Sequence, residues 1–317
     1  MIHRPVDVDR VVKAKRPADY PTNGPPMTAE ERPRFYAELD KPDLDQAALS
    51  EDDPFTAHPG GDWIFDRPDQ VPAIWGQGDE VAWAEDEAFM LAGSDGSGKT
   101  TLAHQLILRM IGLTTDPLLG LPVPPRNRTL YLALDRPSQA ARAIKRLVGT
   151  GDRPALNERL KVIDWPIGLV DQDTDLLLNL ARRHGADTVV VDSVKDCVKE
   201  PSSEVSGQAL KVAYQTAIYA GYQICLLHHD RKQIQGGTGR RLMKLSDVYG
   251  SRWMVAGCGS VIALNGGSGD PVIDLRHLKQ PSAEIGPLKV TFDFETGDVS
   301  LFEGGDLLAI VAAAKQG

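Results

Sequence analysis

The chain has 317 residues, of which 42% are hydrophobic and 25% charged, and its formal net charge is -9. This length and composition are typical of a globular protein with one large or two small domains. No apolar run approaches the roughly 20 residues that a membrane-spanning helix needs, and the charged N-terminus shows no secretory signal. The negative charge excludes binding of nucleic acid over the whole surface, but it does not exclude a local basic groove.

The cysteines indicate the compartment. Cys197, Cys225 and Cys258 have no CxxC spacing, so they favour neither a disulfide framework nor a zinc site, and they fit a reducing cytoplasm.

The first 60 residues differ in composition from the rest. Eleven of the 22 prolines lie between Pro5 and Pro72, and charges of both signs alternate there without a helical or strand period. We predict a poorly ordered extension over residues 1–60, with at most a short helix near 29–39. At the other end, residues 305–317 predict a short apolar helix over 306–315, which could begin a further module.

Between these ends, apolar runs alternate between strand and helix patterns. This alternation predicts an α/β fold, with a mostly parallel twisted sheet flanked by helices and antiparallel strands at the C-terminal end. The predicted elements are, in chain order, a strand at 88–92, a helix at 101–113, a strand at 129–134, a helix at 138–148, a strand at 160–165, a helix at 174–183, a strand at 188–191, a helix at 204–219, and strands at 222–227, 271–278, 288–294 and 299–302.

The most specific motif lies between the first strand and the first helix. It matches G-x-x-x-x-G-K-[ST] at every fixed position and has the strand–loop–helix context that a phosphate-binding loop needs. Its glycines let main-chain N–H groups converge on phosphate oxygens, and the helix start adds a positive end. We expect Lys99 to contact the β and γ phosphates and Thr100 to hold magnesium. The predicted nucleotide-binding residues are Gly93, Ser94, Asp95, Gly96, Ser97, Gly98, Lys99, Thr100 and Thr101.

Two later strands end in a carboxylate. Val189-Val190-Val191-Asp192 fits an aspartate that holds magnesium, and the alternative is an ordinary helix N-cap. Leu132-Ala133-Leu134-Asp135 ends another strand. If that strand neighbours the phosphate-loop strand, Asp135 would lie beside the γ phosphate and orient or deprotonate the attacking water. The alternative for Asp135 is a loop aspartate before Arg136-Pro137.

A third strand ends in His228-His229, and a basic segment follows it. His229 could sense the γ phosphate by hydrogen bonding, or be an exposed strand-end histidine; no third metal ligand has zinc spacing. Residues 230–244 hold five basic residues, one acid and three glycines in an otherwise acidic chain. Such a loop can contact a nucleic-acid backbone or be plain solvated surface. The predicted DNA-binding residues are Arg231, Lys232, Arg240, Arg241 and Lys244.

Taken together, these motifs resemble the RecA/DnaB superfamily of ring ATPases, and within it the RepA-like AAA-domain helicase group of plasmids, phages and actinobacterial genomes. The resemblance implies a RecA-like ATPase domain over residues 61–304, the ligands ATP and Mg²⁺, and a homo-oligomeric, hexameric ring with ATP at subunit interfaces. It rests on five motifs in order, Gly93–Thr101, Tyr131–Ser138, Val189–Asp192, Leu226–Lys232 and Leu275–Phe294.

The resemblance also assigns roles to single residues. Asp135 matches the water-activating carboxylate, where these relatives usually carry glutamate, and His229 matches the γ-phosphate sensor. Lys279 matches the first basic residue of the Lys-x-Arg pair that reaches the neighbouring subunit's ATP. The second falls on Pro281, so Arg276 or Arg252 would supply that charge, or else serve a surface or helix-lining role.

We therefore expect a cytoplasmic, Mg-ATP-dependent ATPase from a bacterium or a phage-infected cell, which translocates on single-stranded DNA as a replicative helicase with other replication proteins. Three alternatives stay open. They are a KaiC-like or RecA-like ATPase that remodels a protein or DNA without unwinding, a small-molecule kinase, and a nucleotide-binding module that hydrolyses poorly.

Overall fold

The computed structural model describes residues 57–229, 243–248, 250, 252–293 and 295–302. The chain divides into two units, residues 1–67 and 68–317. Within the first unit, the described part holds α2 (Gly60–Phe65), whose large apolar side chains are exposed. The predicted N-terminal extension and the helices predicted at 29–39 and 306–315 lie outside the described residues.

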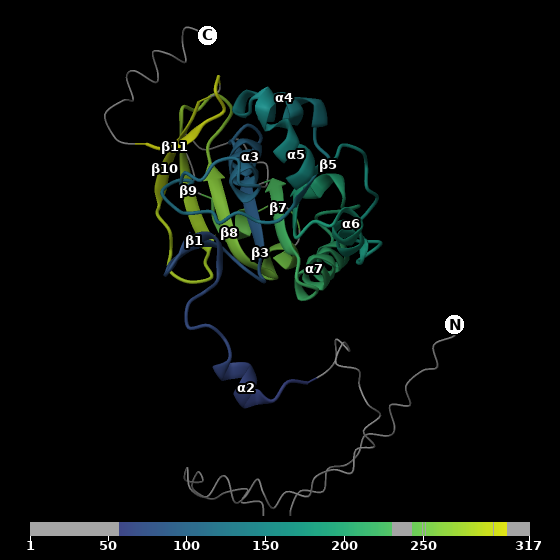
Figure 1. Ribbon diagram of the computed structural model, residues 1–317. Helices are drawn as coiled ribbons and strands as arrows, with labels where there is room; N and C mark the ends of the chain where they lie inside the picture. Colours follow the sequence, from purple (N-terminus) through teal and green to yellow (C-terminus); the bar gives the residue numbers. More distant parts are fainter. Residues whose placement is uncertain (1–56, 230–242, 249, 251, 294, 303–317) are drawn as a thin grey trace, which may run out of the picture. The chain divides into compact units, whose positions relative to one another are not determined.

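The second unit is an α/β domain (Figure 1). Its strands are β1 (Ala73–Gln77), β2 (Glu80–Ala84), β3 (Ala88–Gly93), β4 (Thr129–Ala133), β5 (Leu160–Ile163), β6 (Thr188–Asp192), β7 (Gln223–His229), β8 (Cys258–Asn265), β9 (Val272–Lys279), β10 (Leu288–Phe292) and β11 (Val299–Leu301). Its helices are α3 (Lys99–Met110), α4 (Pro137–Leu147), α5 (Arg153–Arg159), α6 (Leu176–His184), α7 (Glu204–Tyr219) and α8 (Arg252–Ala256), with a 3₁₀ turn at Val194–Asp196.

Nine of these strands form one sheet in the order β11-β10-β9-β8-β3-β7-β6-β4-β5. Neighbouring strands from β5 to β8 pair in parallel, whereas β9, β10 and β11 continue the sheet antiparallel. This arrangement confirms the predicted α/β fold with its antiparallel C-terminal strands. The carboxyl ends of β3, β7, β6 and β4 meet at one edge, which is where a parallel sheet places its functional side chains.

The sheet has an apolar core on each face. All six residues of β3 are buried: Met90 packs with the side chains of α6, α7 and α8, whereas Phe89 and Leu91 pack with those of α3 and the β1–β2 hairpin. Because both faces are covered, the central strands are continuous apolar runs. Within the described residues, no helix is long and apolar enough to cross a membrane.

Several predicted boundaries shift by a few residues for local reasons. Helix α3 begins at Lys99 and ends at Met110, because Gly112 then takes a positive φ of 75°. Strand β10 ends at Phe292 rather than 294, because the Asp293 side chain accepts hydrogen bonds from the main-chain N–H groups of Glu295 and Thr296 and so begins the turn. The β1–β2 hairpin, β8 and α5 were not predicted.

A buried histidine makes the stability of this domain sensitive to acid. Both ring nitrogens of His277 have partners that suit the neutral ring: Ser260 Oγ lies 2.8 Å from Nε2, and the main-chain N–H of Ile285 donates to Nδ1 over 3.4 Å. Burial lowers the pKa of His277 to about 4. The folded protein therefore binds fewer protons than the unfolded chain, whose histidines titrate near 6.5.

The stabilisation from neutral His277 is complete above pH 6.5 and is lost as the pH falls toward 4. We expect this residue to lower the free energy of unfolding by up to about 2 kcal/mol between pH 7 and pH 5. Urea unfolding at the two pH values measures the drop, and His277→Gln should show a smaller one. An equal drop in the variant would contradict this assignment.

Candidate functional site

The loop 93–98 joins β3 to α3 and has a backbone that two glycines make possible. Gly96 and Gly98 adopt φ values of 76° and 89°. A Cβ on Gly98 would lie 2.5 Å from the ring of Phe292 in β10, and one on Gly96 would lie 2.7 Å from the side chain of Ser268. Glycine is therefore required at both positions, by conformation and by the close approach of the C-terminal part of the sheet.

Lys99 is the first residue of α3 and folds back over this loop. Its Nζ donates hydrogen bonds to the carbonyl oxygens of Gly93 and Ser94, both at 2.7 Å, and the residue is buried, with a relative exposure of 7%. The ammonium group thus lies next to the positive end of a helix. Together they form an electropositive site of the kind that binds phosphate.

Thr100 and Asp192 bring two oxygen ligands together beside the loop. Asp192 is the last residue of β6, and its Oδ2 accepts a hydrogen bond from Thr100 Oγ1 at 3.0 Å. Burial raises the pKa of the Asp192 carboxyl, while hydrogen bonds from Tyr131 and Thr100 oppose that rise. A hydroxyl and a carboxylate, completed by phosphate oxygens, fit the donor set that Mg²⁺ prefers. The residues present therefore suit a nucleotide-bound magnesium ion.

Asp135 reaches the same edge by a different route from the predicted one. The predicted adjacency of β4 and β3 is wrong, because β7 and β6 lie between them. Strand β4 instead pairs with β6, and the main-chain N–H groups of Leu134 and Asp135 donate to the Asp192 carbonyl oxygen at 2.6 and 3.0 Å. This pairing places Asp135 beside the metal-type pair rather than directly beside the loop strand.

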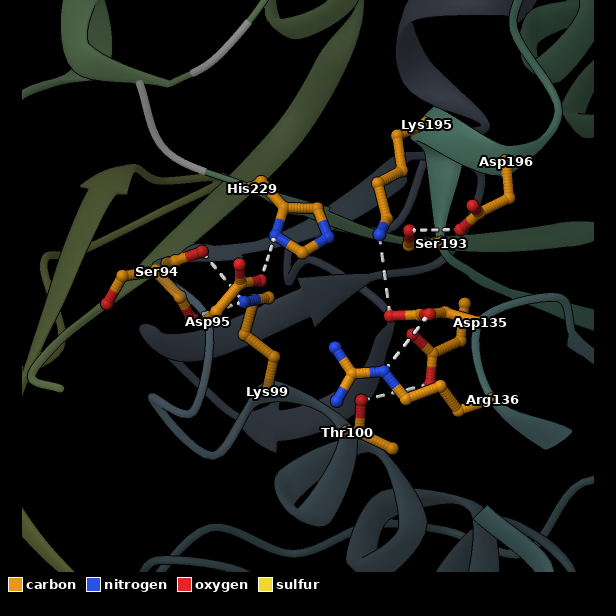
Figure 2. A network of polar contacts seen from close by, with 12 residues as sticks. Ser94, Asp95, Lys99, Thr100, Asp135, Arg136, Ser193, Lys195, Asp196 and His229 are labelled. Carbon is orange, nitrogen blue, oxygen red and sulfur yellow. Dashed lines mark hydrogen bonds and ion pairs between the residues drawn. The ribbon is translucent and has the colours of Figure 1, made fainter. Parts of the chain in front are cut away.

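His229, the last residue of β7, faces the phosphate-type loop. Its Nδ1 lies 2.8 Å from Asp95 Oδ1, a contact that Figure 2 shows. Burial and the neighbouring Lys99 lower the pKa of His229, although Asp95 works against them. Its Nε2 is buried and has no hydrogen-bond partner within the described residues. A polar atom at the loop edge, with hydrogen-bonding capacity to spare, suits contact with a ligand oxygen.

The structure adds two cations that the sequence reasoning did not select. Lys195 Nζ and Arg136 Nε each lie 3.5 Å from the carboxylate of Asp135, one on either oxygen. Figure 2 shows Lys195 extending from the turn after β6 toward Asp135, with His229 nearby. The positions of both residues, directly after a strand-end carboxylate, were the available signal: Lys195 follows Asp192 by three residues and Arg136 follows Asp135 by one.

The three basic residues suggested for action in trans lie apart from this edge. Lys279 pairs with Val261 in β8 and donates to the Ala256 carbonyl oxygen at 3.0 Å, whereas the loop residue Gly93 pairs with Leu264 at the other end of the same strand. The guanidinium of Arg252, in α8, lies 5.7 Å from the centroid of the neighbouring Trp253 ring. Arg276 lies in β9. These positions do not bring the three cations to the site within one chain.

Most of the predicted DNA-binding residues lie outside the described part of the structure. Lys244 is described and is exposed. Its main-chain N–H donates to Asp247 Oδ2 at 2.9 Å. The others, Arg231, Lys232, Arg240 and Arg241, fall in the segment 230–242, which the structure does not describe.

Comparison with known proteins identifies relatives of this arrangement. A family model described as an AAA domain matches residues 61–235. Among solved structures, the fold is similar to that of a helicase ATPase domain, with a TM-score of 0.55 and 10% identity over 77% of this chain and 96% of that one. No curated protein sequence matches the chain. At this identity the structural likeness concerns the fold, which is that of the RecA-like P-loop ATPases.

Proposed function

The chain belongs to this AAA-domain family and is a P-loop ATPase of the RecA/DnaB type; from that premise we propose that it forms a ring and moves on single-stranded DNA as a helicase. ATP with Mg²⁺ is the fuel in this proposal. The ring is a hexamer with ATP at the subunit interfaces, and the protein works with other replication proteins in a bacterial or phage-infected cytoplasm.

One observation carries the catalytic part of the proposal: four strand ends bring their functional groups to one edge of the sheet. In it, Lys99 and the loop N–H groups bind the phosphates, and Thr100 with Asp192 holds the magnesium ion. Asp135 orients the attacking water, and His229 contacts the γ phosphate. Bound magnesium would neutralise charge on the phosphates.

The DNA part rests on position and charge. The basic segment 230–244 follows directly after His229, at the edge of the sheet that carries the ATP site. A change at the γ phosphate sensed by His229 would thus act on residues joined to it in the chain. The charges of Lys279, Arg276 and Arg252 lie away from their own loop, which suits a role at a neighbouring subunit's site.

Steady-state ATP hydrolysis with and without single-stranded DNA tests this function. We expect a several-fold stimulation by DNA, and we expect Lys99→Ala to abolish both rates because it removes the cation of the phosphate site. Lys145→Ala, which removes an exposed lysine from the last turn of α4, serves as a matched control with normal rates. Hydrolysis that is indifferent to DNA would contradict the motor and favour action on a protein partner or a metabolite.

A strand-displacement assay then separates helicase action from remodelling without unwinding. Displacement of a labelled strand that needs both ATP and Lys99 supports a helicase. DNA-stimulated hydrolysis without displacement would instead identify an ATPase that moves on DNA or remodels a protein bound to it.

A further inference from the structure

A buried chain of hydrogen bonds runs from the interior of α3 to the magnesium-type carboxylate. The hydroxyl of Tyr131, in β4, donates to Asp192 Oδ2 at 2.9 Å. Behind it, His104 Nε2 lies 3.1 Å from the Tyr131 oxygen, and the two rings meet edge to face with centroids 5.4 Å apart. Tyr131 is fully buried and His104 nearly so.

The direction of these bonds follows from the donors and acceptors present. Because the single hydroxyl proton of Tyr131 goes to the carboxylate, its oxygen must accept from His104, which therefore carries its proton on Nε2. Burial lowers the pKa of His104 to about 4, so the ring is neutral. Its other nitrogen, Nδ1, has no partner within the described residues, which agrees with this tautomer.

The structure assigns Tyr131, held in place by His104, as a positioning residue for the magnesium ligand Asp192. Both hydrogen bonds that the structure gives the Asp192 side chain, from Tyr131 and Thr100, end on Oδ2. Two donors on one oxygen fix the rotation of the carboxylate and leave Oδ1 to serve the metal and its water. This inference rests on the proposed function, because it concerns the metal site of the proposed ATPase.

The geometry explains why this role belongs to a tyrosine. Strand β4 pairs with β6, so Tyr131 lies in register with Val190, two residues before Asp192. A phenol spans that offset along the strand, whereas a serine or threonine hydroxyl would stop short of it. The ring also fills space in the core between β4 and α3, so one side chain both packs and orients.

Tyr131→Phe tests the inference, since it removes one oxygen and keeps the ring. We expect the variant to bind the Mn²⁺–nucleotide complex roughly ten-fold or more weakly, because loss of an outer-shell partner typically costs 10–100-fold in metal affinity. Electron paramagnetic resonance of free Mn²⁺, titrated with protein and ADP, gives this affinity without any turnover. Binding of a fluorescent ATP analogue in excess chelator should stay unchanged.

A matched control is available in the same domain. Tyr214 in α7 is equally buried, and its hydroxyl donates to the Met254 carbonyl oxygen at 3.2 Å. Tyr214→Phe should therefore cost similar stability and leave Mn²⁺ affinity at the wild-type value. His104→Leu provides a second variant, because it removes only the donor behind Tyr131. We expect a loss of Mn²⁺ affinity in it that is smaller than in Tyr131→Phe, and no added loss when the two changes are combined.

The outcomes separate the two levels of the proposal. Weaker Mn²⁺ binding in Tyr131→Phe but not in Tyr214→Phe supports the positioning role. Unchanged Mn²⁺ affinity in Tyr131→Phe, with normal binding by the wild type, overturns this inference alone. Absence of nucleotide-dependent Mn²⁺ binding in the wild-type protein overturns the proposed function as well.

Discussion

Asp192→Asn is expected to lower the rate of ATP hydrolysis by about 100-fold or more, without loss of thermal stability. The amide keeps the shape of the side chain and can still accept from Thr100 and Tyr131, but it removes the charge that holds magnesium. Burial raises the pKa of the Asp192 carboxyl, so at neutral pH the ionised form is the costly one for the fold. Removal of that charge should leave the melting temperature unchanged or higher.

The opposite signs of the two effects make this prediction specific. Hydrolysis and thermal melting should be measured on the same preparation, with Asp196→Asn as the control. Asp196 lies four residues further along, is exposed, and accepts a hydrogen bond from Ser193 Oγ at 2.8 Å. We expect near-normal activity from that control. If Asp192→Asn hydrolysed ATP at a rate close to that of the wild type, Asp192 would not be a magnesium ligand.

The parallel core could be predicted from the sequence because its signals are local. A buried strand such as β6 is a run of β-branched residues, and α7 has a Ser203 side chain that accepts from the Ser206 N–H at its start. The phosphate-type loop is also local, since its glycines, Lys99 and Thr100 lie within one short stretch of the chain. Local patterns fix such features whatever the order of the strands.

The missed elements had weaker or hidden signals. In the β1–β2 hairpin, Gly78 takes a φ of 58° in a two-residue turn with Asp79, which is a hairpin signal that could have been found. Near the start of strand β8, a glycine and a serine interrupt the apolar run. Gly259 is needed there because a Cβ would collide with the Glu87 side chain, a contact between residues far apart in the chain.

The site itself depends on strand order, which the sequence does not reveal. Asp135, Lys195 and His229 lie at the ends of three different strands, and only the order β3-β7-β6-β4 brings them to one edge. The Tyr131–Asp192 hydrogen bond spans 61 residues and depends on the register of β4 with β6. Tyr131 alone reads as a core aromatic in a strand, so its second role was invisible before pairing was known.

The carboxylate after β4 carries the second large prediction. Asp135→Asn should lower the turnover number for ATP by at least about 100-fold, the range typical of a positioned acid–base group. The Michaelis constant should change far less, because Lys99 and the loop bind the phosphates. An initial-rate series over ATP concentration, with Asp187→Asn as the control, separates the two. Asp187 precedes β6 at the opposite end of the sheet, where it accepts from the Asn127 N–H.

Two companion variants decide whether Asp135 acts through its length or only its charge. Asp135→Glu restores the longer side chain and should match or exceed the wild-type rate if the short aspartate limits the position of the water. Lys195→Ala removes one of the two cations 3.5 Å from Asp135. If Lys195 serves only to hold that carboxylate, its loss should have little further effect in Asp135→Asn. A normal turnover number in Asp135→Asn would remove Asp135 from the mechanism, and Lys195 would then face the ligand by itself.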